Sequence, residues 1–352
     1  MLVSLLALLG ATAGVALSHG TRAAPGHLVA YDLATGAVRF DVTAPTASVH
    51  LHAIGEGVVV ATGADDCNAA QRESAFAVSL ADGALRWSRA LRGACSDYAA
   101  PGTLGGGTVA VTTRHGVSGW SLQDGSSRWT HRGLGPPGQL AGTVVASNDG
   151  ETVFLHARDG RVITSRPIIH DAAQAYTGRR TAVFVAPGGL LTGIDVADGR
   201  VLWRQRDAAL TGGFQVVGET GGAFVVDRDV RDLRGGRLLW ASTSSPIAVG
   251  AGLAFTQDAG ELHAFDIRTG ALRWEIALPP PDPVADRQIV AGAGAVAVID
   301  PDSITLLEAS TGATRWRAAL DPATRHAYPA GAIARGMLLI PATSPDWVPY
   351  DE

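Results

Sequence analysis

Four histidines have the residue type and the position to ligate a metal ion. His50 and His52 flank Leu51, and because side chains alternate along a strand, both imidazoles should lie on one side of it. His170 and His326 occupy comparable stretches before other inner strands of the expected fold. If the units align, all four imidazoles approach one mouth of a central channel, where they could bind a metal. The alternative, polar residues lining a wet channel or loop, is favoured because no metal-ligand spacing motif is present.

Acidic and amide side chains recur at a second kind of position, after the second strand of an expected unit. Together they could form a rim whose oxygen atoms hold calcium. The alternative, ordinary turn residues, is favoured, since aspartate is common in turns and no EF-hand spacing is present. The residues are Asp65, Asp66, Asn148, Asp149, Asp227, Asp229, Asp258, Asp300 and Asp302.

Other catalytic and binding patterns are missing from the sequence. No G-x-S-x-G motif accompanies the serines, and no phosphate-binding or dinucleotide-binding glycine loop occurs. All 28 basic residues are arginine, which excludes lysine Schiff-base and lysine-nucleophile chemistry. The net charge is −5 and no basic cluster occurs, so nucleic acid is a poor candidate partner.

An eight-fold internal repeat supplies the elements that must position these residues. A turn glycine recurs every 34 to 47 residues, and in six of the eight copies a tryptophan follows four residues later. Upstream of each turn lies an apolar run typical of a buried strand. A repeat of about 40 residues made of short strands predicts a β-propeller, because one such unit cannot bury its own face alone. The turn glycines are Gly36, Gly83, Gly125, Gly160, Gly199, Gly236, Gly270 and Gly312.

Each unit is predicted to be a four-stranded blade, and the ring is predicted to close through both termini. The chain begins with the outer half of a blade, around 28–40, and ends with an inner half, around 332–340. Pairing of these halves removes free sheet edges, which are a liability of open sheets. The sequence therefore predicts an all-β, eight-bladed propeller over residues 27–352, closed by pairing of the N- and C-terminal strands.

The repeat resembles that of the pyrroloquinoline-quinone (PQQ) repeat family of eight-bladed propellers. Its motif A-x-D-x-x-T-G-x-x-x-W is matched best by residues 264–274. In that family the tryptophan docks against the neighbouring blade, near its turn glycine. Phe40 and Thr164 depart from the motif and should make weaker blade contacts. The resemblance assigns the docking role to Trp87, Trp129, Trp203, Trp240, Trp274 and Trp316.

Two functions follow from this resemblance. Quinoprotein dehydrogenases with such repeats hold PQQ over the channel and use an adjacent cysteine pair, calcium, a carboxylate base and basic contacts to the cofactor. This sequence has no adjacent cysteine pair and little length beyond the blades. In repeat type and size it also resembles the propeller subunit of the outer-membrane β-barrel assembly machinery. We expect a non-enzymatic binding scaffold without a cofactor; a small oxidoreductase that uses PQQ and calcium is the alternative.

The N-terminus indicates export. Residues 1–17 are almost wholly apolar and carry no charge, and Ala16-Leu17-Ser18 offers a small-residue cleavage site before His19. We expect residues 1–18 to be a cleaved signal peptide, with a membrane anchor as the alternative. Residues 19–26 are then a short linker. The expected location is extracytoplasmic, and the expected partner of this monomer is an envelope or extracellular protein or ligand.

The two cysteines, Cys67 and Cys95, fit the same compartment. An even, small number of cysteines in an exported chain suggests a disulfide. Cys67 lies between the second and third strands of one expected blade, and Cys95 follows the fourth strand of that blade. Both connections open on the same face of a propeller, so we expect a Cys67–Cys95 bond; two free buried thiols are the alternative.

Overall fold

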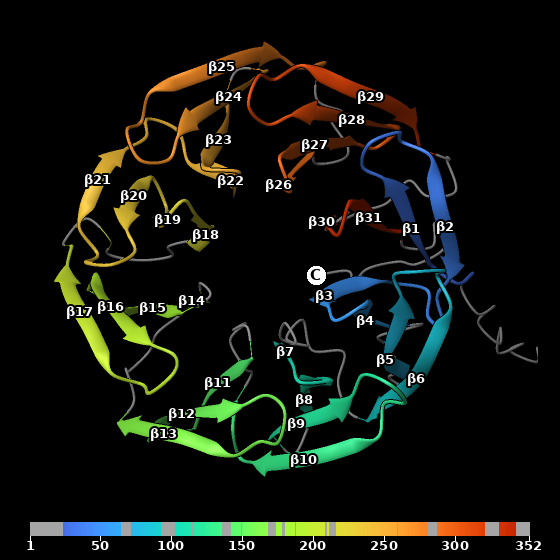
Figure 1. Ribbon diagram of the computed structural model, residues 1–352, viewed down its shortest axis with the longest axis vertical. Helices are drawn as coiled ribbons and strands as arrows, with labels where there is room; N and C mark the ends of the chain where they lie inside the picture. The colour runs from blue at the N-terminus through green and yellow to red at the C-terminus, as the bar shows by residue number, and fades with distance from the viewer. Residues whose placement is uncertain are drawn as a thin grey trace, which may run out of the picture.

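The chain folds into a ring of eight β-sheets around a central axis (Figure 1). The computed structural model describes residues 24–64, 72–92, 103–113, 116–135, 142–148, 150–167, 174–177, 180–186, 188–207, 210, 216–258, 260–280, 287–320 and 331–342. These residues form 31 strands and no helix. Seven sheets have four strands, and one has three in the described residues. The predicted all-β, eight-bladed propeller is confirmed.

Six blades consist of four consecutive strands, with the first nearest the axis and the fourth outermost (Figure 1). They are β3–β6 (His50–Gly55, Val58–Ala64, Arg72–Ser79, Leu85–Arg92), β7–β10 (Thr103–Gly105, Thr108–Thr113, Gly116–Ser121, Ser127–Arg132), β14–β17 (Gln174–Thr177, Thr181–Ala186, Leu190–Asp195, Val201–Arg206), β18–β21 (Val216–Thr220, Ala223–Val226, Asp229–Asp232, Leu238–Ala241), β22–β25 (Pro246–Gly250, Leu253–Asp258, Glu261–Asp266, Leu272–Ala277) and β26–β29 (Gln288–Gly292, Ala295–Asp300, Ser303–Glu308, Thr314–Ala319). The three-stranded sheet contains β11 (Thr143–Ser147), β12 (Glu151–His156) and β13 (Val162–Pro167).

The remaining blade joins the two ends of the chain. Its inner strands are β30 (Ala332–Ala334) and β31 (Met337–Ala342), and its outer strands are β1 (His27–Asp32) and β2 (Val38–Thr43). β1 pairs antiparallel with β31, from His27 opposite Ala342 to Asp32 opposite Met337. The predicted closure is confirmed: the red inner strands meet the blue outer strands in Figure 1.

The core is divided among the interfaces between neighbouring blades. Every residue of β4 is buried, because its two faces serve two interfaces. Val59 packs with Leu339 of the closing blade, whereas Val60 packs with Val109 of the following blade. Burial on both faces explains why the second strands are continuous apolar runs instead of alternating ones.

Two-residue turns join first to second strands in six blades. Both residues of each turn have positive φ, as in Ala293 at 47° and Gly294 at 74°. Such turns match the right-handed twist of the strands they join, and glycine adopts this conformation without a Cβ clash. In these six blades the glycine before the second strand therefore belongs to the turn. The pairs are Glu56-Gly57, Gly106-Gly107, Gly221-Gly222, Ala251-Gly252, Ala293-Gly294 and Arg335-Gly336.

Strand polarity separates the connections onto two faces of the ring. The face that holds the two-residue turns also holds the third-to-fourth turns with the repeat glycines, and we call it the turn face. The opposite face, which we call the connection face, joins second to third strands and each blade to the next. Strand ends on the connection face are joined by the longest segments, including 93–102, 278–287 and 320–331.

Carboxylates lock the turns on the turn face. Asp32 Oδ1 accepts hydrogen bonds of 3.0 Å from the backbone amides of Ala34 and Thr35, while Oδ2 accepts one of 2.7 Å from Arg39 Nη2. The arginine first, and then the Thr35 hydrogen bonds, lower the pKa of Asp32 to about 2. Asp266 is held in the same way by Arg273, and its pKa is also about 2.

Candidate functional site

Tryptophans on the fourth strands contact the next blade at equivalent points. Trp274 Nε1 donates a 2.7 Å hydrogen bond to the carbonyl of Ala309. Its ring lies so close to the next turn that a Cβ at Gly312 would be 2.9 Å from Trp274 Cδ2. This contact leaves room only for glycine. The donor and acceptor pairs are Trp87 and Leu122, Trp129 and Ala157, Trp203 and Leu233, Trp240 and Ile267, Trp274 and Ala309, and Trp316 and Leu33.

Two blades lack this tryptophan. The Phe40 ring lies against Gly83, and the Thr164 methyl group lies against Gly199. Phenylalanine has no donor group, and the Thr164 hydroxyl bonds to the carbonyl of its neighbour Ser165. The small Thr164 side chain therefore covers much less of the next blade than a tryptophan would.

A second contact between blades was missed by the sequence analysis. In four consecutive blades, a polar side chain two positions after the docking residue bonds to a glycine carbonyl of the next turn. His131 Nε2 lies 2.6 Å from the carbonyl of Gly160, and Arg166 Nε donates to that of Gly199 at 3.2 Å. Arg89 and Gln205 make the equivalent bonds. The signal in the sequence was a long polar residue at a fixed distance after the turn glycine.

The predicted histidine pair lies on the inner strand β3. His52 Nε2 is 2.6 Å from Thr62 Oγ1 on β4. Burial, with a smaller contribution from His50, lowers the pKa of His52 to about 4, so the imidazole is neutral at physiological pH. His50 is exposed. His170 and His326 lie outside the described residues, so the proposed grouping of four imidazoles stays a prediction.

A buried carboxyl group lies on the same blade. Glu73, near the start of β5, is 9% exposed, and no ion pair in the described part of the chain includes it. Burial raises the pKa of Glu73 to about 7. Nothing in the repeat pattern singled out this residue, because the degree of burial of one polar side chain is a property of the folded structure.

Glu73 should make the protein less stable as the pH rises. Its folded pKa is above its unfolded value, so its contribution is fully present below about pH 4.5 and is lost as the pH rises through 7. His52 acts in the opposite sense, because its lowered pKa costs stability as the pH falls from about 6.5 to 4. The difference in free energy of unfolding between Glu73→Gln and the wild type should shift in favour of the variant by roughly 1–3 kcal/mol when the pH is raised from 5 to 8.5. Urea unfolding of both proteins at both pH values measures this shift. If the difference between the two proteins is the same at pH 5 and pH 8.5, the pKa of Glu73 is not raised by burial.

The expected acidic rim is engaged in turns and ion pairs where the structure describes it. Asp300 Oδ1 accepts a 2.6 Å hydrogen bond from Arg287 Nε, and Asp258 Oδ2 accepts one of 3.2 Å from Ser244 Oγ. Asn148 Oδ1 caps its own turn. Within the described residues these carboxylates form no group of three converging ligands. Asp65, Asp66 and Asp149 lie outside those residues.

A buried charge centre joins two blades beside this rim. The Arg231 side chain is 6% exposed and contacts Asp207, which follows β17, and Asp229, at 2.6 Å on its own strand β20. Its Nη1 also donates to the carbonyl of Gly236. Burial, the largest cause, and the neighbouring Asp207 raise the pKa of Asp229 against the effect of Arg231. The sequence analysis placed Asp229 in the rim but did not foresee its partner.

The described residues do not fit a bound PQQ. The cofactor requires oxygen ligands for calcium and basic groups that can reach its carboxylates at the channel. On the described inner strands the acidic or imidazole side chains are His50, His52 and Glu219. Arg287, beside β26, is bound to Asp300. We therefore assign no PQQ-dependent step to the described residues.

The predicted disulfide and leader lie outside the described residues. Cys67 and Cys95 fall in segments 65–71 and 93–102, and the expected signal peptide falls in 1–23. In the part of the chain that is described, no helix is long and apolar enough to cross a membrane.

Comparison with known proteins assigns the family. Residues 24–169, 168–283 and 225–344 match a family model described as outer membrane protein assembly factor BamB. The chain belongs to the BamB family. The predicted relationship to PQQ-like repeat propellers is thereby confirmed. Comparison with curated protein sequences gave no match.

Solved structures share the fold of this BamB-family chain at low sequence identity. BamB from Moraxella catarrhalis is 15% identical, with a TM-score of 0.50 over 87% of this chain and 88% of that one. The computationally designed Ika8 protein is 14% identical, with a TM-score of 0.60 over 84% and 94%. Dihydro-heme d1 dehydrogenase NirN is 11% identical, with a TM-score of 0.59 over 84% and 73%. An assembly factor, a designed protein and a dehydrogenase share this fold, so the fold alone does not decide the activity.

Proposed function

We propose that this BamB-family propeller is an extracytoplasmic scaffold that binds a protein partner through its connection face and catalyses no reaction. The observation that carries the proposal is the difference between the two faces. On the turn face, two-residue turns and carboxylate-locked turns repeat from blade to blade. The segments that join one blade to the next on the connection face differ in length, from 242–245 to 320–331, and their sequences do not repeat. Binding residues are found disproportionately on such loops, held by a rigid scaffold.

The inner strands favour a protein over a small molecule. A small-molecule site needs a concave pocket in which a few polar groups converge. The described inner strands carry mostly aliphatic side chains, such as Ile247, Val290 and Ile333. A broad face rimmed by loops is better suited to a protein surface, which buries about 800 Å² per partner in an interface of standard size.

The extracytoplasmic location rests on two observations. The apolar N-terminal segment ends in a small-residue cleavage pattern before His19. The family to which the chain belongs is named for an outer membrane assembly factor. A partner in the cell envelope is consistent with both.

Photo-crosslinking in whole cells tests the binding face. A photoreactive amino acid is placed at Asp258 or Asp302 on the connection face and, as matched controls, at Asp82 or Asp198 on the turn face. All four residues are exposed. We expect adducts with an envelope protein from the connection-face positions alone. Adducts from the turn face alone, or from neither face, would overturn the proposal.

A further inference from the structure

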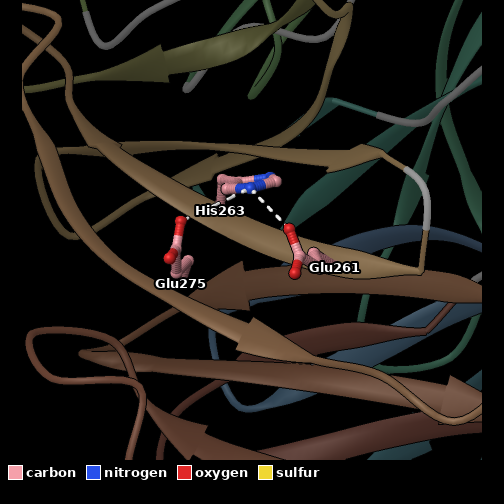
Figure 2. Close-up of side chains that lie close together, drawn as sticks. All are labelled: Glu261, His263 and Glu275. Atoms are coloured by element: carbon pink, nitrogen blue, oxygen red, sulfur yellow. Dashed lines mark ion pairs between the residues drawn. The ribbon is translucent and has the colours of Figure 1, made fainter.

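Three side chains that can ligate a metal meet on the outer strands of the blade β22–β25 (Figure 2). Glu261 and His263 come from the third strand β24, and Glu275 comes from the fourth strand β25. His263 Nε2 lies 3.3 Å from a Glu261 oxygen and 3.8 Å from a Glu275 oxygen. All three ligand atoms lie within 4.8 Å of one another.

Strand geometry produces this arrangement. Glu261 and His263 are two residues apart and therefore point to the same side of β24. His263 is directly opposite Glu275 in the pairing of β24 with β25. The imidazole is 19% exposed and lies beside the Phe265 ring, with centroids 6.2 Å apart, whereas the carboxylates are 52% and 59% exposed. A partly buried imidazole is thus flanked by two carboxylates that solvent can reach.

Among the described residues, the two carboxylates have no arginine partner. In the described residues, the ion pairs of Glu261 and Glu275 are with His263 alone. By contrast, turn carboxylates on the outer strands are paired with arginine, as Asp266 is with Arg273 and Glu308 with Arg315. When the imidazole is neutral, two negative charges remain side by side, and a bound cation would stabilise them.

We infer that Glu261, His263 and Glu275 form a binding site for a divalent transition-metal ion of the zinc type. One imidazole nitrogen with two carboxylate oxygens is a donor set that zinc accepts, and imidazole disfavours calcium and magnesium. Two ligands about 2.05 Å from a tetrahedral ion lie about 3.3 Å apart. The 3.3 Å and 3.8 Å separations are therefore already near those of a three-ligand zinc site, whose fourth position opens to solvent.

The propeller fold itself does not require these three residues. In the closing blade, the positions of Glu261, His263 and Glu275 are occupied by His27, Val29 and Asp41, which supply only two donors. His27 Nδ1 and Asp41 Oδ1 form a simple 2.8 Å pair there. The third donor is specific to the blade β22–β25, and this makes the closing blade a matched control.

Zinc binding by the purified full chain tests the inference. After dialysis against a small excess of Zn²⁺, we expect one bound zinc per chain, measured by elemental analysis, and a rise in Tm with zinc concentration. His263→Gln should weaken binding by at least about tenfold, since even groups that only orient a ligand are worth about tenfold. His27→Gln should leave the affinity unchanged. Circular dichroism and the Tm without zinc establish that both variants are folded.

X-ray absorption identifies the ligands independently. We expect a zinc shell of nitrogen and oxygen with a single imidazole and without sulfur. Sulfur in the shell would assign the metal to Cys67 or Cys95, and two or more imidazoles would assign it to the channel histidines. Either spectrum, no bound zinc, or equal binding by wild type and His263→Gln would overturn the inference.

Discussion

Replacement of Trp274 by alanine should lower the free energy of unfolding by about 3–5 kcal/mol. The side chain is 9% exposed, so its loss removes most of a large apolar contact between two blades. It also leaves the carbonyl of Ala309 without its indole donor. Trp203→Ala should cost a similar amount, because Trp203 is 8% exposed and donates equivalently to Leu233.

The blade without a tryptophan supplies the control. Thr164 occupies the equivalent position and reaches the next turn with one methyl group. Thr164→Ala should therefore cost no more than about 1 kcal/mol. Urea unfolding followed by circular dichroism avoids the loss of tryptophan fluorescence in the variants. Equal stability of Trp274→Ala and the wild type would refute the docking role.

Removal of the Arg231 side chain should have an effect of comparable size. Arg231→Met leaves Asp207 and Asp229 facing each other between two blades without their cation. Breaking a buried ion pair by removing one partner costs about 3–5 kcal/mol, because the remaining charge is uncompensated. The loss should be smaller at acidic pH, where protonation of the carboxylates removes their repulsion.

A triple variant separates the charge effect from packing. Arg231→Met combined with Asp207→Asn and Asp229→Asn removes all three charges and should recover much of the lost stability. The exposed pair Arg200 and Asp198, 3.8 Å apart, is the comparison, and Arg200→Met should change stability by no more than about 0.5 kcal/mol. If the triple variant does not recover stability, the loss caused by Arg231→Met comes from altered packing and not from uncompensated charge.

The fold could be predicted from the sequence because the same local pattern of residues occurs eight times. A turn glycine, an apolar run and a tryptophan at fixed spacing define a blade, and the offset of the two half-blades defines the closure. In six blades the glycine before the second strand belongs to a two-residue turn, which the repeat pattern alone does not distinguish from a strand residue. That distinction depends on backbone φ, which composition and periodicity do not reveal.

The buried and clustered polar side chains were harder to predict from the sequence. The Arg231 centre joins neighbouring blades, and the approach of Glu275 to His263 requires the exact pairing of β24 with β25. Glu73 looks like an ordinary surface residue in the sequence, yet it is buried in the folded chain. Such groups arise from packing and register between segments, whereas the tryptophan contacts could be anticipated because the repeat encodes them.

The most direct test of the proposed scaffold is the ratio of crosslinked adduct between the two faces. Asp302 on the connection face and Asp198 on the turn face are both exposed and differ in the face they occupy. The account predicts a discrete adduct with one envelope protein at position 302 and none above background at position 198. Adduct at position 198 equal to or greater than that at position 302 would contradict it.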